Sequence, residues 1–223
     1  MKVFVAIPSY DAKVTSSCAQ SLFKAAYHCA KYGIEIEPHF IRGGIFIDHV
    51  RSLIVRRFLE TDCTHLFFID ADIGFESDAL TGLVMSGHPV SAGIYLKRTD
   101  EKKRFNAKVH EPQEVINGWL RMDRVATGFL CIERRVLDEM SKRAPVLGLG
   151  RDGRVPMVFH FSYEGGNGGY IGEFAGEDYS FCDDYNKLVE EGVFDQPIWA
   201  YPDITFDHDG YIGNLHESLS EDL

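Results

Sequence analysis

The sequence predicts an α/β protein in which a mostly parallel central sheet is flanked by helices. Short apolar runs alternate with segments of helical periodicity through the first half of the chain. Several of these runs end directly in polar or acidic residues, at the position where parallel sheets bind their ligands. The chain has 223 residues, 45% of them hydrophobic, which suits one domain with a substantial core over residues 1–223.

The first half of the chain contains four predicted strands separated by helical segments. In the first of these segments Leu22, Ala25 and Cys29 recur at helical spacing, and Gly33 follows where a C-cap glycine belongs. After a glycine loop, a second segment places four apolar residues on one face: Val50, Leu53, Ile54 and Phe58. A short helix is expected over Ala79–Met85. The predicted strands are Val3–Ile7, Ile34–Ile41, His65–Ile69 and Val90–Leu96.

The second half is less regular. We expect a strand over Val125–Ile132 and a helix from Arg134 to about Arg143, which Pro145 ends. Glycines crowd the stretch Gly148–Gly172, and this composition predicts a flexible loop that could act as a lid. Glu177–Glu190 has the pattern of an amphipathic helix.

Composition excludes several classes of function. Lys and Arg total 23 against 34 Asp and Glu, a net charge of −11, so nucleic acid is not an expected partner. The five cysteines include no CxxC pair, which argues against a zinc site and for reduced thiols in a cytoplasmic protein. The first residues are typical of a strand rather than a signal peptide, and we expect no transmembrane segment.

Two acids follow the most apolar predicted strand directly. Asp70 and Asp72 flank Ala71, and in an extended chain they would lie on the same side, about 6.5–7 Å apart. Neighbouring carboxylates repel each other unless a positive charge lies nearby. Mg²⁺ or Mn²⁺ would supply that charge, because both ions prefer oxygen ligands. The alternative is that both acids are merely solvated at a strand–loop junction.

Acidic residues also mark two later segments. Asp178 shares a helix face with Phe181, Cys182 and Tyr185, which predicts an inward-pointing acid, whereas Glu177 is explained by the helix macrodipole. Near the end of the chain, His208 lies between Asp207 and Asp209 in an aromatic and acidic stretch.

Together, in this order, these segments resemble the glycosyltransferases of GT-A fold, most of all the large inverting, family 2-like group. Val5-Ala6-Ile7-Pro8-Ser9-Tyr10 is similar to the first strand and base-contacting turn of that fold. Asp48-His49-Val50-Arg51-Ser52 is similar to the helix start that contacts base and ribose, although Ser52 replaces the usual asparagine. Asp70-Ala71-Asp72 matches the DxD signature, and the segments around residues 90–98 and 126–132 resemble the central strands beside the sugar pocket.

The resemblance implies a role for each of these positions. The donor, a UDP-sugar more readily than a GDP-sugar, is bound by Pro8, Ser9, Tyr10, Asp48, Arg51, Asp70, Ala71 and Asp72. A Mn²⁺ or Mg²⁺ ion is held by Asp72 and His208, with Asp70 beside them and Asp207 and Asp209 as substitutes. Gly128 and Glu177 belong to the acceptor or sugar pocket, and Asp178 is the general base of an inverting transfer to a glycan or other hydroxyl acceptor. Residues from 1 to about 97 form the nucleotide-binding half, and the remainder forms the acceptor and catalytic half.

Three other functions compete with this one. A nucleotidyltransferase usually carries a glycine-rich basic loop after its first strand, where this chain has Pro8-Ser9-Tyr10-Asp11. A metal-dependent phosphoesterase built from the same acids would need two bound metals. A non-catalytic carbohydrate-binding module would bind sugar without turnover and would be indifferent to Asp178.

Overall fold

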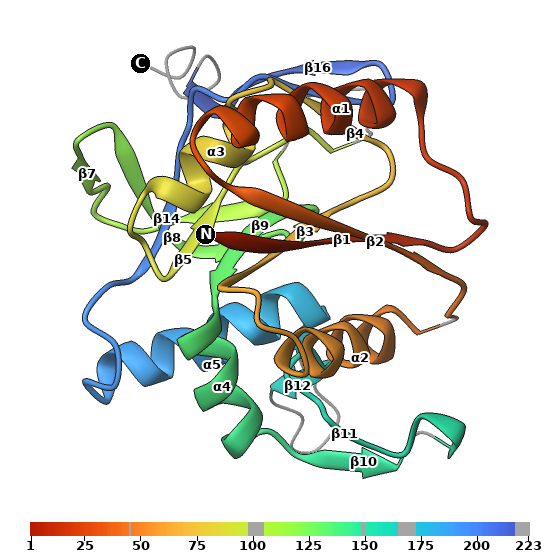
Figure 1. Cartoon of the computed structure of the whole chain (residues 1–223). Coiled ribbons are helices and arrows are strands. Elements are labelled where there is room, and N and C mark those ends of the chain that lie inside the picture. The colour runs from red at the N-terminus through yellow and green to blue at the C-terminus, as the bar shows by residue number, and fades with distance from the viewer. Residues whose placement is uncertain (45, 98–104, 149, 165–172, 217–223) are drawn as a thin grey trace.

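The computed structural model describes residues 1–44, 46–97, 105–148, 150–164 and 173–216 of the chain (Figure 1). It is a three-layer α/β structure in which helices cover both faces of a central sheet, as the sequence predicts. The helices are α1 (Ser16–Lys31), α2 (Ile47–Leu59), α3 (Ala79–Met85), α4 (Arg134–Arg143) and α5 (Glu177–Glu190), with a 3₁₀ turn at Gly150–Asp152. In the described part of the chain, no helix has the length and apolarity needed to cross a bilayer.

The central sheet has nine strands in the described residues, in the order β2-β1-β3-β9-β5-β14-β8-β6, with β7 also paired to β8. β2, β1 and β3 are parallel to one another, and β5 is parallel to β14. The strands are β1 (Lys2–Ser9), β2 (Glu35–Arg42), β3 (His65–Ile69), β5 (Val90–Ala92), β6 (Ala107–Val109), β7 (Val115–Ile116), β8 (Trp119–Val125), β9 (Phe129–Glu133) and β14 (Ile198–Ala200).

The expected mostly parallel sheet is therefore interrupted. β9 inserts antiparallel between β3 and β5, and β8 is antiparallel to β14. The single strand expected over Val125–Ile132 is wrong: the chain ends β8 at Val125, turns through Gly128 and starts β9 at Phe129. The strand expected over Val90–Leu96 ends at Ala92, and Leu96 instead forms an isolated antiparallel bridge with Phe105.

Three smaller sheets complete the fold. β4 (Ile73–Phe75), β15 (Phe206–His208) and β16 (Tyr211–Gly213) form one antiparallel sheet. β10 (Val146–Gly148) pairs with β11 (Arg154–Pro156), and β12 (Ser162–Glu164) pairs with β13 (Glu173–Ala175). The loop expected over Gly148–Gly172 thus contains strands, and its glycine-rich centre, residues 165–172, lies outside the described residues.

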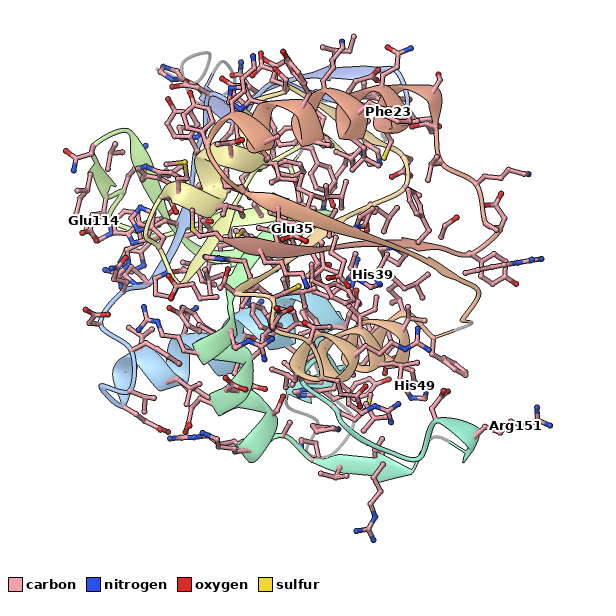
Figure 2. All side chains as sticks on the ribbon, in the orientation of Figure 1. Phe23, Glu35, His39, His49, Glu114 and Arg151 are labelled. Atoms are coloured by element: carbon pink, nitrogen blue, oxygen red, sulfur yellow. The ribbon has the colours of Figure 1, made fainter. Side chains whose placement is uncertain are left out.

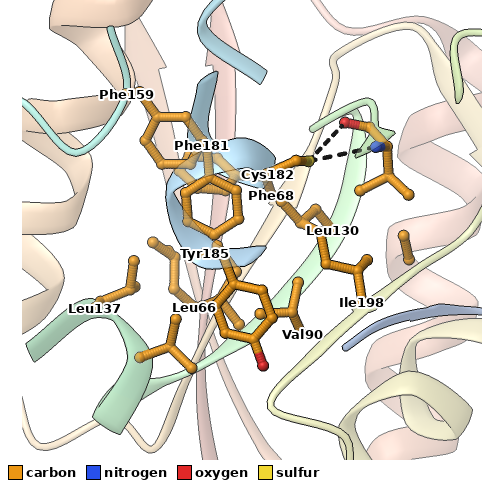
Figure 3. Packing of buried hydrophobic residues seen from close by; sticks show 14 of the residues in the cluster. Leu66, Phe68, Val90, Leu130, Leu137, Phe159, Phe181, Cys182, Tyr185 and Ile198 are labelled. Atoms are coloured by element: carbon orange, nitrogen blue, oxygen red, sulfur yellow. Dashed lines mark hydrogen bonds between the residues drawn. The ribbon is translucent and has the colours of Figure 1, made fainter. Parts of the chain in front are cut away.

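The two faces of the sheet carry separate cores because side chains alternate along each strand. Phe4, Leu66 and Phe68 face α2, α4 and α5, whereas Val5 and Phe67 belong to the cluster beneath α1 and α3. On the first face, the Phe159 ring stacks on Phe181 at 4.8 Å between centroids and meets Phe68 edge-on at 5.4 Å. Figure 3 shows these rings beside Cys182, whose Sγ is hydrogen-bonded to the backbone of Val125. This packing fixes α5 against the sheet.

The C-terminal ends of α1 and α4 follow the predicted signals, whereas the N-cap of α1 was not predicted. Thr15 caps α1 by accepting a hydrogen bond from the Cys18 backbone N–H at 3.2 Å, and Gly33 has a φ of +68° just beyond the helix. Ala144 is extended before Pro145 and ends α4. Figure 2 shows Phe23 on the outer side of α1, where it is 82% exposed.

Candidate functional site

A cavity of about 510 Å³ lies at the carboxyl ends of β1 and β3. Parallel pairing of β1 with β3, Ala6 opposite Phe68, brings the residues that follow each strand to the same edge of the sheet. The lining residues in the described chain are Pro8, Ser9, Tyr10, Asp11, Lys13, Val14, Thr15, Asp70, Ala71, Asp72 and Asp209. The structure therefore gathers six of the eight predicted donor-binding residues around one cavity.

The chain turns sharply within the two-acid motif. The Ile73 backbone N–H donates to the Asp70 carbonyl at 3.1 Å, and the Asp70 N–H donates to the Gly128 carbonyl at 2.9 Å. The extended geometry expected for Asp70–Asp72 is therefore wrong, because β3 ends at Ile69 and a turn leads into β4. The two carboxylates find different partners: Asp70 Oδ1 lies 3.3 Å from Arg51 Nη2, and Asp72 Oδ2 lies 3.8 Å from His208 Nε2.

His208 reaches Asp72 through the small antiparallel sheet. β15 pairs with β4, which places His208 opposite Ile73, one residue after Asp72. Gly74 allows this approach, since a Cβ there would lie 2.9 Å from Ser17 Cβ and 3.3 Å from Asp207 Cβ. His208 therefore lies beside Asp72 because β15, more than 130 residues further along the chain, pairs with β4.

The chemistry of this pair suits a divalent cation. The Leu96 carbonyl accepts a hydrogen bond from His208 Nδ1 at 2.6 Å, so in the neutral ring Nε2 carries the lone pair and faces a carboxylate oxygen. A backbone carbonyl bound to the far nitrogen is the usual outer partner of a metal-ligating histidine. Asp72 and His208 therefore fit as two ligands of Mn²⁺ or Mg²⁺.

Asp70 does not join them in a ready-made three-ligand cluster. In the described part of the chain, the one group of three metal-ligating side chains with atoms within 4.8 Å of one another is Glu37, Asp62 and Cys63. Lys2 Nζ lies 2.6 Å from Asp62 and 3.0 Å from Glu37, so a lysine already neutralises those acids. At the cavity, Arg51 pairs with Asp70 Oδ1 at 3.3 Å, and Asp209 also lines the cavity.

Arg51 is buried and links two parts of the site. Its guanidinium contacts the Glu177 carboxylate through Nη1 and Asp70 through Nη2, and its side chain is only 7% exposed. Its Nε is buried and has no hydrogen-bond partner among the described residues. Arg51 therefore braces the motif after β3 against the start of α5, and it is not among the residues that line the cavity.

The first turn of α5 carries two acids in a desolvated setting. Burial raises the pKa of Asp178, and the negative charge of Asp70 adds to this shift, while Arg51 opposes it. Asp178 Oδ2 accepts a hydrogen bond from Asn106 Nδ2 at 3.3 Å, and Oδ1 accepts one from the Tyr179 N–H at 2.8 Å. Burial likewise raises the pKa of Glu177 even though Arg51 contacts it. The macrodipole alone does not account for Glu177, because it is buried and ion-paired.

Gly128 packs so closely against Tyr95 and Asp70 that this position has no room for a side chain. A Cβ at this position would lie 2.1 Å from the Tyr95 hydroxyl oxygen and 2.6 Å from Asp70 Oδ2. Tyr95 is buried, and its ring meets the His208 ring edge-on at 5.2 Å. Burial and the charge of Asp70 raise the pKa of Tyr95 well above its ordinary value. Tyr95 therefore fills the space between Asp70 and His208.

Asp48 lies in the first turn of α2 and is buried, with Oδ1 lacking a partner among the described residues. Like Arg51, it is absent from the residues that line the cavity. The preceding glycine loop is tied to β1, since the Gly43 N–H donates to the Ser9 carbonyl at 3.1 Å. The loop that leads into α2 is therefore anchored to the turn that contains Ser9 and Tyr10.

Sequence reasoning missed several residues of this region. Lys13 lines the cavity and pairs with Asp11 at 3.2 Å, and the Thr15 N–H donates to the Ala71 carbonyl at 2.9 Å. The N-cap signal of a threonine before a helix could have located Thr15. No sequence signal marked Tyr95 or Asn106, which approach the acids only through tertiary packing.

The chain matches no protein-family model and no curated protein. Among solved structures it resembles A197 from STIV, with 17% identity over 93% of this chain and 85% of the other, at a TM-score of 0.56. That likeness shows a shared fold. Two further structures align less well: a glycosyltransferase involved in the glycosylation of the major capsid of PBCV-1 (10% identity, 62% and 63% coverage, TM-score 0.35) and S. aureus TarS 1-349 (13% identity, 62% and 49% coverage, TM-score 0.39). Their TM-scores are too low to establish a common fold with this chain.

Proposed function

We propose that this chain is a divalent-metal-dependent glycosyltransferase of GT-A type. It transfers a sugar from a nucleotide-diphosphate donor, a UDP-sugar in preference to a GDP-sugar, to a hydroxyl group of a glycan or other acceptor. One observation carries the proposal. The acids after β3 lie between a histidine suited to metal binding, 3.8 Å from Asp72, and a buried arginine that connects Asp70 to Glu177 of α5.

The donor would occupy the cavity at the ends of β1 and β3. Its volume of about 510 Å³ falls within the range of small-molecule sites. Asp72 and His208 would hold Mn²⁺ or Mg²⁺, and the bound ion would neutralise charge on the leaving diphosphate. The turn after β1 would bind the nucleoside, so that residues 1–97 form the donor half and residues 98–223 the acceptor half.

Asp178 is the proposed general base of an inverting transfer. An acceptor hydroxyl hardly ionises near neutral pH, so a base must remove its proton as the new bond to the sugar forms. Burial raises the pKa of Asp178 and makes it a stronger base than an exposed aspartate. Its hydrogen bonds from Asn106 and the Tyr179 backbone fix the carboxylate in one orientation.

The geometry favours transfer over the competing functions. A two-metal phosphoesterase would need Asp70 as a further metal ligand, but Arg51 already pairs with it. A nucleotidyltransferase would need a glycine-rich loop after β1, whereas this turn is Pro8-Ser9-Tyr10-Asp11. A binding module would have no use for a buried acid such as Asp178, whose pKa is raised by burial and by the charge of Asp70.

The test is a transfer assay with UDP-sugars, GDP-sugars and Mn²⁺, with product anomeric configuration read by NMR. Asp178→Asn should lower kcat by about 10²–10⁴-fold while leaving the donor Kd nearly unchanged. Asp184→Asn on the same helix is the matched control, because its side chain is 39% exposed and pairs with Lys187. Wild-type transfer rates in Asp178→Asn would remove the base assignment.

A further inference from the structure

A second cavity, of about 380 Å³, lies at the other end of α1. It is lined by His28 and Tyr32 at the C-terminal end of α1, by residues of α3, by Trp119 at the start of β8, and by Tyr201, which follows β14. Thr15, at the N-cap of α1, lines the first cavity, and 13 residues of helix at 1.5 Å each separate Thr15 from His28 by about 20 Å. The two cavities share none of their described lining residues.

The walls of this second cavity are apolar and aromatic. Trp119 and Tyr201 lie with ring centroids 5.3 Å apart at 51°, and Tyr32, 54% exposed, contributes a third ring. Leu83 and Ile204 supply aliphatic surface. Its volume falls within the range of sites that bind small ligands.

The acidic and basic side chains that line the cavity are three carboxylates and one histidine, His28, whose Nδ1 lies 2.9 Å from Thr81 Oγ1. Glu76, Asp78 and Asp203 line it, and no lysine or arginine is among its described lining residues. Two of these carboxylates are oriented by neighbours: Glu76 accepts from the Thr205 N–H at 3.3 Å, and Asp203 accepts from His216 Nδ1 at 2.6 Å. A phosphate or nucleotide would meet three negative charges here and be repelled.

A bare metal ion does not match this arrangement. In the part of the chain that the structure describes, these three acids do not form a group with ligand atoms within 4.8 Å of one another. A neutral sugar would donate hydroxyl hydrogen bonds to the carboxylates but would leave their negative charges without a counter-charge. An organic cation suits both the aromatic walls and the carboxylates of this cavity, because aromatic faces attract cations and carboxylates form ion pairs with them.

We infer that this cavity is a binding site for an organic cation, an alkylammonium or guanidinium group carried on an apolar stem. The group would lie against Trp119 and Tyr201 with its charge directed to Glu76, Asp78 and Asp203. A small amine and the lysine or arginine side chain of a partner polypeptide share this chemistry. The inference does not depend on the proposed transferase activity, because the cavity lies apart from the two-acid motif.

Tryptophan fluorescence offers a direct readout. The chain has two tryptophans, and Trp199 is 5% exposed, so a ligand in the cavity would mainly change the emission of Trp119. The full chain would be titrated with choline, N-acetyl-lysine methylamide and N-acetyl-arginine methylamide. N-acetyl-leucine methylamide and methyl glucoside are the neutral comparisons. We expect saturable binding of a cationic probe with a Kd on the order of 1 mM. Tighter binding of choline would identify a small amine as the ligand, and tighter binding of the lysine or arginine amide would identify a side chain of a partner polypeptide.

Variants that replace carboxylates by amides distinguish binding in the cavity from the general attraction of cations to an acidic protein. Glu76→Gln/Asp78→Asn should weaken cation binding about threefold to tenfold, the range of two exposed ion pairs. Glu35→Gln/Glu190→Gln removes the same charge at two exposed positions outside the cavity and should bind normally (Glu35 is labelled in Figure 2). Asp72→Ala should also bind normally, which keeps this result separate from the donor site. Absence of saturable binding, equal weakening in both double variants, or tighter binding of methyl glucoside would overturn the inference.

Discussion

Arg51 on α2 and Glu177 at the first position of α5 form an ion pair in which the side chains are only 7% and 10% exposed. The same guanidinium also contacts Asp70 Oδ1 at 3.3 Å. One buried cation thus connects the motif after β3 to the helix that carries Asp178. Since a buried charge without a partner is costly, this connection should be visible in both stability and activity.

Removing the guanidinium should destabilise the fold strongly. Arg51→Ala leaves two carboxylates without their cation and should lower the free energy of unfolding by about 3–5 kcal/mol. Arg51→Ala/Glu177→Ala should recover part of this loss, because it removes one of the stranded acids as well. Urea unfolding of the two single variants and the double variant measures the coupling. Losses that simply add would show that the pair is not coupled.

The buried acid Asp178 should make stability depend on pH. Its pKa is raised in the folded protein, mainly by burial, so the folded state holds that proton more tightly than the unfolded state. Its contribution to stability is therefore fully present below the unfolded pKa of about 3.9 and is lost as pH rises through the higher folded value. Asp178→Asn should gain stability relative to wild type as pH rises from about 4 to 7, measured by urea unfolding at each pH. A difference that stays constant with pH would contradict the raised pKa.

Substitution at Gly128 should damage the site through a specific clash. A Cβ in Gly128→Ala would overlap the Tyr95 hydroxyl oxygen, at 2.1 Å, and crowd Asp70 Oδ2, at 2.6 Å. Overpacking of this kind costs about 1–3 kcal/mol, and the shifted Asp70 should lower transfer. Tyr95→Phe/Gly128→Ala should recover only part of this loss, since it removes the hydroxyl oxygen at 2.1 Å but keeps the ring Cζ at 2.6 Å.

Gly82→Ala is the control for this prediction, because a Cβ at Gly82 has open space within helix α3. It should leave stability unchanged or raise it by up to about 1 kcal/mol. Thermal unfolding and the transfer assay compare all of these variants. A Gly128→Ala protein as stable and active as Gly82→Ala would show that the site tolerates the added methyl group.

His208 should contribute to metal affinity beyond its packing. His208→Ala should weaken Mn²⁺ binding by at least about tenfold to a hundredfold, the loss typical of removing an outer partner alone, because it removes both the proposed ligand and the ring that the Leu96 carbonyl orients. The natural comparison is His216→Ala, which removes an exposed histidine paired with Asp203. Electron paramagnetic resonance of bound Mn²⁺ gives the affinities. Equal Mn²⁺ affinity in wild type and His208→Ala would exclude the histidine as a ligand.

The bounds of a strand or helix are predicted best where its hydrophobic pattern continues without interruption. β3, α3 and α5 have the predicted bounds because an apolar run or a helical face defines each one locally. The antiparallel insertion of β9 between β3 and β5 escaped prediction because strand direction depends on pairing between distant segments. The predicted strand pattern nonetheless placed Asp70, Asp72 and the turn after β1 at one edge of the sheet.

The sequence predicted that the segments after β1 and β3 meet at one edge of the sheet, but not the contacts between their side chains. Helical spacing indicated that Asp178 points inward, yet it gave no reason to pair Glu177 with Arg51, which lies 126 residues away. The extended-chain argument for Asp70 and Asp72 failed because a backbone turn, which Gly128 helps to hold, begins at Asp70. Such contacts depend on which helix packs over which strand, and local sequence does not encode that choice.

Calorimetric titration with UDP and GDP, each with and without Mn²⁺, tests the proposed function most directly. The proposal predicts that one diphosphate, UDP before GDP, binds only with Mn²⁺ and that Asp72→Ala abolishes this binding. Asp195→Ala, at an exposed acid outside the cavity, should bind like wild type. Failure of both nucleotides to bind the wild-type protein under any of these conditions would contradict the account of the site as a metal-dependent donor site.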